Sequence, residues 1–136
     1  MTISIRPFVD TDADDLVEIL KLNHQYDYPD VEGPDSMKRV GRCEAAIFLV
    51  AVVDGGTAGL IKAVYDGSRA LIHLLSVHPD QQGKSVGNRL VDEVKKELTA
   101  RGATGVTVTV SDRSADFWEK IGFERLPVFL MLNEFK

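Results

Sequence analysis

The sequence predicts an α/β domain of the α+β type, built on a mostly antiparallel sheet, and three observations lead to this fold class. Two tight-turn signals, residues 54–56 and 66–69, separate apolar runs, which is the pattern of an antiparallel meander. A strongly periodic helix, residues 86–98, follows a glycine-containing loop. No internal repeat or linker divides the chain, so we expect a single domain over residues 1–136.

The N-terminal third is predicted to contain one strand and two helices. Ile3 and Ile5 alternate with polar residues, which is typical of a strand. The acidic run at residues 10–15 indicates the start of a helix, because carboxylates are favoured in a first helical turn. Aromatic residues, glycine and prolines over residues 24–34 indicate a loop, and a weak pattern over residues 35–44 predicts a short helix.

The remaining strands come from the meander and from two later segments. The meander strands are expected over residues 48–53, 57–65 and 70–77. Alternating Thr and Val predict a strand over residues 104–110, and an apolar run predicts a final strand over residues 128–135.

The clearest helix has an apolar residue at every fourth position. Val86, Leu90, Val94 and Leu98 form one stripe, and charged residues fill the positions between them. A shorter helix is expected over residues 114–121.

Composition restricts the classes of function. The chain of 136 residues has a formal net charge of -5 and lacks a basic block, which disfavours nucleic-acid binding. Its one cysteine, Cys43, excludes an intrachain disulfide and fits a reducing compartment. The longest apolar run, residues 45–53, is far shorter than the roughly 20 residues that span a bilayer. We therefore expect a cytoplasmic protein without a signal peptide or a membrane partner.

The junction at residues 75–87 is a candidate phosphate site. A strand ends there, small residues turn the chain and an amphipathic helix begins, so unpaired helical N–H groups face the turn. The alternative is that the glycines serve only the turn. A P-loop is excluded because His78 stands where that motif needs its first glycine, and the spacing does not fit a dinucleotide-binding fingerprint either.

Two segments resemble the GNAT superfamily of acetyltransferases. The first resembles the family's acetyl-CoA-binding motif, and the residues that carry it are Leu75, Val77, Pro79, Gln82, Gly83, Lys84 and Gly87. The second, residues 117–123, resembles the family's aromatic-Glu-Lys-x-Gly-Phe signature. The order of predicted elements agrees with the family as well, so the resemblance covers essentially the whole chain.

The resemblance implies both a fold and a reaction. The expected GNAT-like fold has a central twisted sheet, mixed but mostly antiparallel, of about six to seven strands flanked by about four helices. The expected activity is N-acetyl transfer from acetyl-CoA, as co-substrate and without a metal, to a primary amine on a small molecule or peptide by direct attack in a ternary complex. The residues implied in acetyl-CoA binding are Leu75, Val77, Gln82, Gly83, Lys84, Ser85, Val86, Gly87, Ser111 and Trp118.

The chain departs from the family at three of these positions. Ser85 replaces a motif glycine, and Ser111 replaces an asparagine often found at the end of the strand. Trp118 stands where many members have a tyrosine that protonates the leaving thiolate, and an indole N–H cannot act as that acid. These replacements motivate an alternative function, a non-catalytic acyl-CoA-binding or regulatory module with the same fold.

Residues for the remaining roles are predicted with alternatives left open. His73 aligns with a glutamate that several members carry, so it is the candidate general base, the alternative being a buried histidine satisfied by a neighbour. Tyr26, Tyr28 and Tyr65 are candidates for contacting the acceptor, or else loop residues without that role. The apolar segment at residues 128–132 predicts pairing across the edge of a homodimer.

Overall fold

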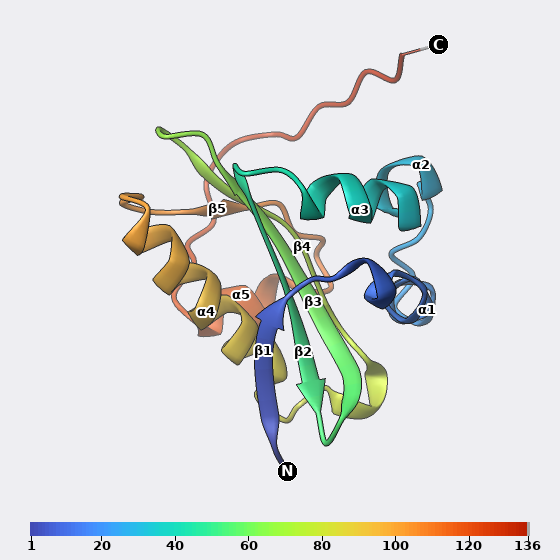
Figure 1. Ribbon diagram of the computed structural model, residues 1–136. Coiled ribbons are helices and arrows are strands. Elements are labelled where there is room, and N and C mark those ends of the chain that lie inside the picture. Colours follow the sequence, from blue (N-terminus) through green and yellow to red (C-terminus); the bar gives the residue numbers. More distant parts are fainter. Residues whose placement is uncertain (136) are drawn as a thin grey trace.

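The sheet formed by the described residues has five strands and separates two groups of helices (Figure 1). The computed structural model describes residues 1–135. The strands lie in sequence order across the sheet: β1 (Ile3–Pro7), β2 (Ala46–Val53), β3 (Gly56–Tyr65), β4 (Ala70–Val77) and β5 (Thr107–Val108). The first four are antiparallel neighbours, and β5 pairs with β4 in parallel, so the sheet is mixed but mostly antiparallel, as predicted.

Each face of the sheet is covered by its own helices (Figure 1). One face carries α1 (Ala13–Leu22), the one-turn α2 (Pro29–Glu32) and α3 (Pro34–Gly41), preceded by the 3-10 turn η1 (Asp10–Asp12). The other face carries α4 (Val86–Ala100) and α5 (Ala115–Lys120). A second 3-10 turn, η2 (Pro79–Gln81), lies between β4 and α4.

The inner strand β2, between β1 and β3, is buried on both faces, which explains its uninterrupted apolar sequence. Val50 packs in the cluster that contains the α1 residues Leu16 and Leu20, whereas its neighbour Ala51 packs in the cluster that contains Leu90 of α4. Consecutive side chains of a strand point to opposite faces, so a strand between two helical layers needs apolar residues at every position.

An ion pair fixes the start of α1. The Arg6 guanidinium donates two hydrogen bonds of 2.8 Å to the buried Asp12 carboxylate, which also accepts one from the Val9 N–H. The hydrogen bonds from Arg6 are the main cause that lowers the pKa of the Asp12 carboxyl below its ordinary value. The pair therefore ties β1 to the helix that follows it.

A second ion pair holds α2 against the sheet. Lys62 of β3 is buried, and its ammonium lies 2.6 Å from a carboxylate oxygen of Glu32. The same ammonium lies 5.7 Å from the centre of the Phe48 ring. A buried lysine needs such partners, because an unpaired charge in the interior is strongly unfavourable.

The sheet has fewer strands than the six to seven expected from the family resemblance. The segment predicted as a strand over residues 128–135 pairs with no other part of the described chain and extends away from the body (Figure 1). The strand predicted over residues 104–110 is paired only at Thr107 and Val108, because the chain diverges from β4 beyond that point. The helix predicted over residues 35–44 is observed as Pro34–Gly41.

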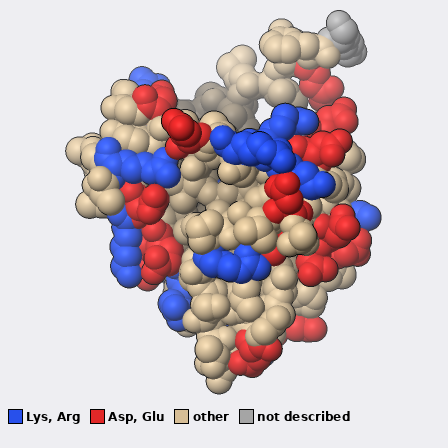
Figure 2. All heavy atoms as spheres, in the orientation of Figure 1, with Lys and Arg blue, Asp and Glu red and all other residues tan. Residues whose placement is uncertain are grey.

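The surface has mixed charge. On the face that Figure 2 shows, Lys and Arg side chains alternate with Asp and Glu over the helices at both sides of the sheet. Over residues 1–135, none of the helices has the length and apolar character needed to cross a membrane.

Candidate active site

A cleft of about 1010 Å³ opens where β4 and the segment after β5 diverge. The two strands pair at Leu71 with Thr107 and at Ile72 with Val108. Beyond these pairs β4 continues to Val77 without a partner on that side, and residues 108–111 form the opposite wall. The volume is near the upper end of the range that is usual for ligand pockets, which is roughly 300–1,000 Å³.

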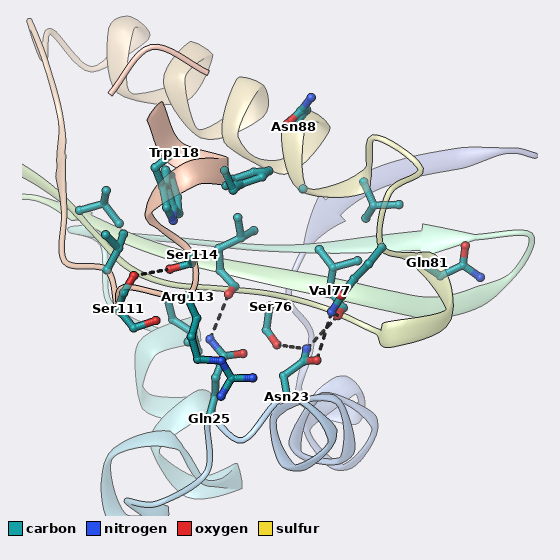
Figure 3. A pocket seen from close by; sticks show the side chains of 18 of the residues that line it. Asn23, Gln25, Ser76, Val77, Gln81, Asn88, Ser111, Arg113, Ser114 and Trp118 are labelled. Carbon is teal, nitrogen blue, oxygen red and sulfur yellow. Dashed lines mark hydrogen bonds between the residues drawn. The ribbon is translucent and has the colours of Figure 1, made fainter. Parts of the chain in front are cut away.

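The rest of the lining comes from three other segments (Figure 3). The loop before α4 and the first turn of that helix close one end, the C-terminal end of α1 with the following loop closes the side, and α5 covers the top of the view. The lining residues from these segments include Asn23, Gln25, Gln82, Gly83, Ser85, Gly87, Arg113 and Trp118.

The side-chain amides of Asn23 and Gln82 hold the C-terminal end of β4. The Asn23 amide donates hydrogen bonds to the Ser76 hydroxyl (2.7 Å) and to the Val77 carbonyl (2.8 Å). The Gln82 amide donates to the same Val77 carbonyl at 3.0 Å and to the Asn23 side-chain oxygen at 3.2 Å. This network joins the end of α1, the end of β4 and the loop that leads to α4.

The open edge of β4 faces the cleft with its backbone polar groups. Gln25 donates from its amide to the Leu75 carbonyl at 3.2 Å, so the carbonyls of both Leu75 and Val77 point away from β3. His78, the next residue, donates instead to the Ala58 carbonyl on the β3 side. The N–H and C=O of one strand residue project to the same edge, so the Leu75 and Val77 N–H groups also face the cleft. This edge can pair with an extended ligand as with an added strand.

His73 lies at a β-bulge at the point where the cleft begins. Ile72 pairs with Ala63 and Leu74 pairs with Lys62, so His73 is the extra residue of β4. The bulge changes the face of the sheet to which alternate side chains of β4 point. Ile72 packs in the core on the side of α4, whereas Leu74, two residues later, packs in the core on the side of α1. His73 is exposed and lines the cleft, and it is therefore not the buried, internally satisfied histidine of the alternative reading.

The loop before α4 presents backbone N–H groups without a competing side chain. Gly83 and Ser85 both have positive φ, 76° and 69°, which is the left-handed region. Ser85 is the N-cap of α4, and its side chain makes no capping hydrogen bond. The first N–H groups of α4 therefore have neither an intrahelical partner nor a side-chain cap, and such groups bind anions. Lys84 is exposed in the same loop and does not line the cleft.

Gly87 and the aromatic residues of α5 pack closely behind this loop. A Cβ on Gly87 would lie 3.2 Å from the Phe117 ring, so only glycine allows this close approach without adjustment. Trp118 packs edge-to-face against both Phe117 and Phe123 and is 5% exposed. It thus belongs to the core while also lining the cleft, with its indole nitrogen pointing toward the strands (Figure 3).

The charged groups of the cleft are few. Among the described lining residues, the side chains that ionise readily are His24, His73 and Arg113, and none is a carboxylate. Arg113 projects from the segment after β5 toward the side of Gln25 (Figure 3). Ser111 and Ser114 lie beside it, and the Ser114 hydroxyl donates to the Ser111 carbonyl at 3.3 Å. Among these lining side chains, a proton acceptor for an attacking amine must therefore be one of the two histidines.

The structure brings together most of the residues predicted from the sequence. One cleft is lined by His73, Leu75, Val77, Ser111, Trp118 and the predicted loop residues Gln82, Gly83, Ser85, Val86 and Gly87. Of the predicted loop residues, Lys84 alone does not line it. Tyr26, Tyr28 and Tyr65 do not line it: Tyr26 packs in the α1-side core, Tyr28 is exposed and Tyr65 lies at the opposite end of β4, beside Ala70.

Asn23, Gln25 and Arg113 were not predicted from the sequence. Their position in the cleft depends on contacts between segments far apart in the chain, for which a single sequence gives no periodic or motif signal.

Comparison with known proteins gives a family match over most of the chain. The model of the acetyltransferase (GNAT) domain family matches residues 25–128. An acetyltransferase from Sodalis glossinidius is 35% identical over 91 residues, which cover 65% of this chain. The match spans 64% of that protein's length, which is less than two thirds.

Solved structures share the fold. The PaiA N-acetyltransferase from Thermoplasma acidophilum, in complex with coenzyme A, superposes with a TM-score of 0.85 at 19% identity, covering 95% of this chain and 94% of that one. A GCN5-related N-acetyltransferase structure from Rhodopseudomonas palustris has a TM-score of 0.71 at 28% identity, covering 90% of this chain and 81% of that one. The likeness to the first of these concerns the fold alone.

Proposed function

Because the chain belongs to the GNAT acetyltransferase family, we propose that it transfers an acetyl group from acetyl-CoA to a primary amine of a small molecule or peptide. The observation that carries the proposal is the open edge of β4 next to an uncapped helix N-terminus. An extended, amide-containing arm fits the first and a diphosphate fits the second, and acetyl-CoA contains both groups joined to each other.

The residues proposed to hold acetyl-CoA follow from this arrangement. The backbone groups of Leu75 and Val77 bind the pantetheine arm, while the loop from Gln82 to Gly87 binds the diphosphate. Gly83 and Ser85 have positive φ, which lets successive backbone N–H groups of the loop point toward a common anion. This is the geometry of an anion-binding nest. Ser111 and Trp118 line the opposite wall of the cleft, against the arm.

Bound acetyl-CoA supplies a thioester, and direct attack by the amine would form an amide bond and release the CoA thiol. A β4 backbone N–H facing the cleft is suited to stabilise negative charge on the carbonyl oxygen. His73 is the proposed general base that takes a proton from the attacking amine, since it is exposed to the cleft at the bulge. His24 lines the same cleft and is the second histidine to test.

Among the described residues beside Trp118 in the cleft, none carries a hydroxyl that can replace the tyrosine acid. The hydroxyls of Ser111 and Ser114 are too weakly acidic to protonate a thiolate, and Trp118 cannot do so. A thiol has a pKa near about 8.5, so a thiolate is a tolerable leaving group near neutral pH. We therefore infer that solvent in the open cleft supplies this proton.

The competing function is binding without turnover. Trp118 favours it, because the indole fills the aromatic cluster of α5 and offers no proton at the place where related enzymes have one. In this case the cleft would still bind acyl-CoA, so only a measurement of turnover separates the two functions.

Calorimetric titration with acetyl-CoA and with CoA tests the binding half of the proposal. Dissociation constants on the order of micromolar are expected for both. Gly87→Leu is the matched negative control, because its side chain would collide with Phe117 at the loop. Absence of binding to the folded wild-type protein, even at millimolar ligand, would refute both the acetyltransferase and the binding module.

A screen of amines for CoA release then tests turnover. Amine-dependent release of thiol supports the enzyme. Binding without release for every class of amine tested, including amino acids, polyamines, aminoglycosides and peptide N-termini, supports the binding module instead.

A further inference from the structure

The cleft lacks acidic side chains, although the chain as a whole has many. Asp and Glu make up 21 of the 136 residues, and the formal net charge is -5. None of the described residues that line the cleft is acidic, whereas His24, His73 and Arg113 all line it. The cleft is therefore a local exception to the negative charge of the chain. A ligand that binds there meets only neutral or basic side chains of the described lining.

Arg113 is the permanent cation of this lining. Its guanidinium stays protonated near neutral pH, unlike an imidazole. Within residues 1–135, Arg113 has neither an ion pair nor a side-chain hydrogen bond. Other arginines of the described chain pair with a carboxylate, namely Arg6, Arg42, Arg101 and Arg125. The guanidinium of Arg113 is thus available to a ligand in the cleft.

The acidic residues next to Arg113 in the sequence form no ion pair with it. Asp112 and Asp116 are exposed and lie outside the lining of the cleft. Their charges act on Arg125, whose pKa is raised mainly by its hydrogen bond with Glu119 and to a smaller extent by these two carboxylates. The positive charge of Arg113 is therefore not cancelled by a carboxylate inside the cleft.

Arg113 faces the part of the cleft next to the proposed position of the thioester. It projects from the wall after β5 toward Gln25 and away from Trp118 (Figure 3). Because Gln25 contacts the Leu75 carbonyl, Arg113 points to the level of Leu75 in β4 and not to the loop before α4. The proposed arm of acetyl-CoA runs from that loop along Val77 to Leu75. Its acyl end, and with it the attacking amine, would then lie at the level of Arg113.

An amine that carries a carboxylate fits this arrangement better than an amine with further positive charges. A guanidinium forms paired, charge-assisted hydrogen bonds with a carboxylate, and these also orient the bound group. Polyamines and aminoglycosides carry additional ammonium groups that need carboxylates around them, and none of the described lining residues supplies one. The arm of acetyl-CoA occupies part of the cleft of about 1010 Å³, so the remaining space suits a small acceptor.

On the basis of the acetyltransferase function proposed above, we propose that the acceptor is a small amine that carries a carboxylate, as a free amino acid does, and that Arg113 binds this carboxylate. The ion pair holds the amine beside the thioester. The amine nitrogen forms a bond to the acetyl carbon, and the bond from that carbon to sulfur breaks with its electron pair on the thiolate. His73 takes the proton that the nitrogen loses, and solvent protonates the thiolate.

Rates of CoA release with matched pairs of amines test the proposal. Each pair is an amino acid and its carboxamide, taken from the α-, β- and γ-amino acids, and a polyamine serves as the cationic comparison. For the best amino acid, kcat/KM of the wild type is expected to be at least about tenfold higher than for its carboxamide, because a hydrogen-bonded ion pair contributes this factor or more. The polyamine should be the poorest substrate.

Substitution of Arg113 should remove this preference through KM. Arg113→Gln is expected to raise KM for the amino acid about tenfold, while the rates with carboxamides and the affinity for acetyl-CoA stay within about threefold. Arg113→Lys should keep part of the preference, because it keeps the charge without the paired hydrogen bonds. Arg113 is exposed, so both variants should fold, as urea denaturation can check. The matched control is Arg39→Gln on α3, an exposed arginine outside the cleft, which should behave as the wild type.

The outcomes separate this inference from the proposed function. A wild type that acetylates carboxamides or the polyamine as well as it acetylates amino acids overturns the inference and leaves the acetyltransferase in place. An Arg113→Gln variant that keeps the preference overturns it too. If this variant also loses affinity for acetyl-CoA, Arg113 binds a phosphate of acetyl-CoA instead. Failure of the wild type to bind acetyl-CoA, or binding without turnover of any amine, overturns the proposed function and this inference with it.

Discussion

The two halves of β4 share one neighbour and differ in the other. Along its whole length β4 pairs with β3, but only the first half, up to Ile72, is also paired with β5. The second half, from Leu74 to Val77, borders the cleft, and its carbonyls are held by side-chain amides. The bulge at His73 separates the two halves. The first half of β4 thus packs in the core, and the second half borders the ligand cleft. We therefore expect substitutions in the first half to change mainly the free energy of unfolding, and those in the second half to change mainly the affinity for a ligand.

The largest effect is expected from matched truncations in the two halves. Ile72 is fully buried in the paired half, so Ile72→Ala should lower the free energy of unfolding by about 3 kcal/mol. Leu75 is half-buried in the open half, so Leu75→Ala should cost less stability and weaken acetyl-CoA binding. Urea denaturation and calorimetry measure the two quantities. Equal loss of affinity in both folded variants would contradict the division of the strand.

Substitution at the boundary between the halves should affect turnover. His73→Gln is expected to lower kcat about 100-fold, with the affinity for acetyl-CoA unchanged, because it removes the proposed base and keeps the polar surface. The rates of the wild type and of the variant are to be compared between about pH 6 and pH 9. His24→Gln is the control in the same cleft. Wild-type rates for His73→Gln across this range would exclude His73 as the base.

Substitution at the start of α1 tests whether the helix that precedes Asn23 and Gln25 depends on the Arg6–Asp12 pair. Asp12→Asn should lower the free energy of unfolding at pH 7 by about 2 kcal/mol, because a buried charge-assisted pair is lost. The folded state lowers the pKa of Asp12, so this stabilisation is present above the ordinary carboxyl value and disappears as the pH falls below about 4.

The control for this substitution is Asp10→Asn, which removes an exposed pair with Arg42. It should change stability by less than about 1 kcal/mol. Wild type and Asp12→Asn should converge in stability in acid, as measured by urea denaturation. A difference that is constant with pH would show that the pair does not act through the charge of Asp12.

The smallest effect is expected at Ser85, which adopts a φ of 69° that glycine tolerates better. Ser85→Gly should raise the free energy of unfolding by less than about 1 kcal/mol, since relief of strain is partly offset by greater freedom of the unfolded chain. Affinity for acetyl-CoA should stay within tenfold. Ser114→Gly, at a φ of -108°, should destabilise instead. A more than tenfold loss of affinity in Ser85→Gly would mean that the serine itself contacts the ligand.

The parts of the fold that were predictable are those encoded by local patterns. The turn signals and apolar runs gave the meander, and the four-residue spacing of Val86, Leu90, Val94 and Leu98 gave α4, which is observed at Val86–Ala100. The strand over residues 104–110 was overestimated, because alternation of Thr and Val reports a tendency to extend and not the presence of a partner. The same reason explains why residues 128–135 read as a strand and are unpaired in this chain.

The candidate site was predictable where a motif carries it. The loop from Gln82 to Gly87 has that motif, and its residues except Lys84 line the cleft. The exposure of His73 was not predictable, because it depends on a bulge that pairing with β3 creates. Asn23 and Gln25 were missed since their contacts reach 54 and 50 residues along the chain.

These long contacts bear on the order in which the molecule folds. The meander joins neighbours along the chain through short turns, so it can form early, whereas the bonds from Asn23 to Val77 close a long loop and come late. The cleft needs residues near positions 23, 75–87 and 108–118 at once, and no isolated hairpin contains it. A chain that has formed its sheet but not docked α1 would have no site for acetyl-CoA. Recovery of ligand binding during refolding should therefore mark the last step, the arrival of the end of α1 on β4.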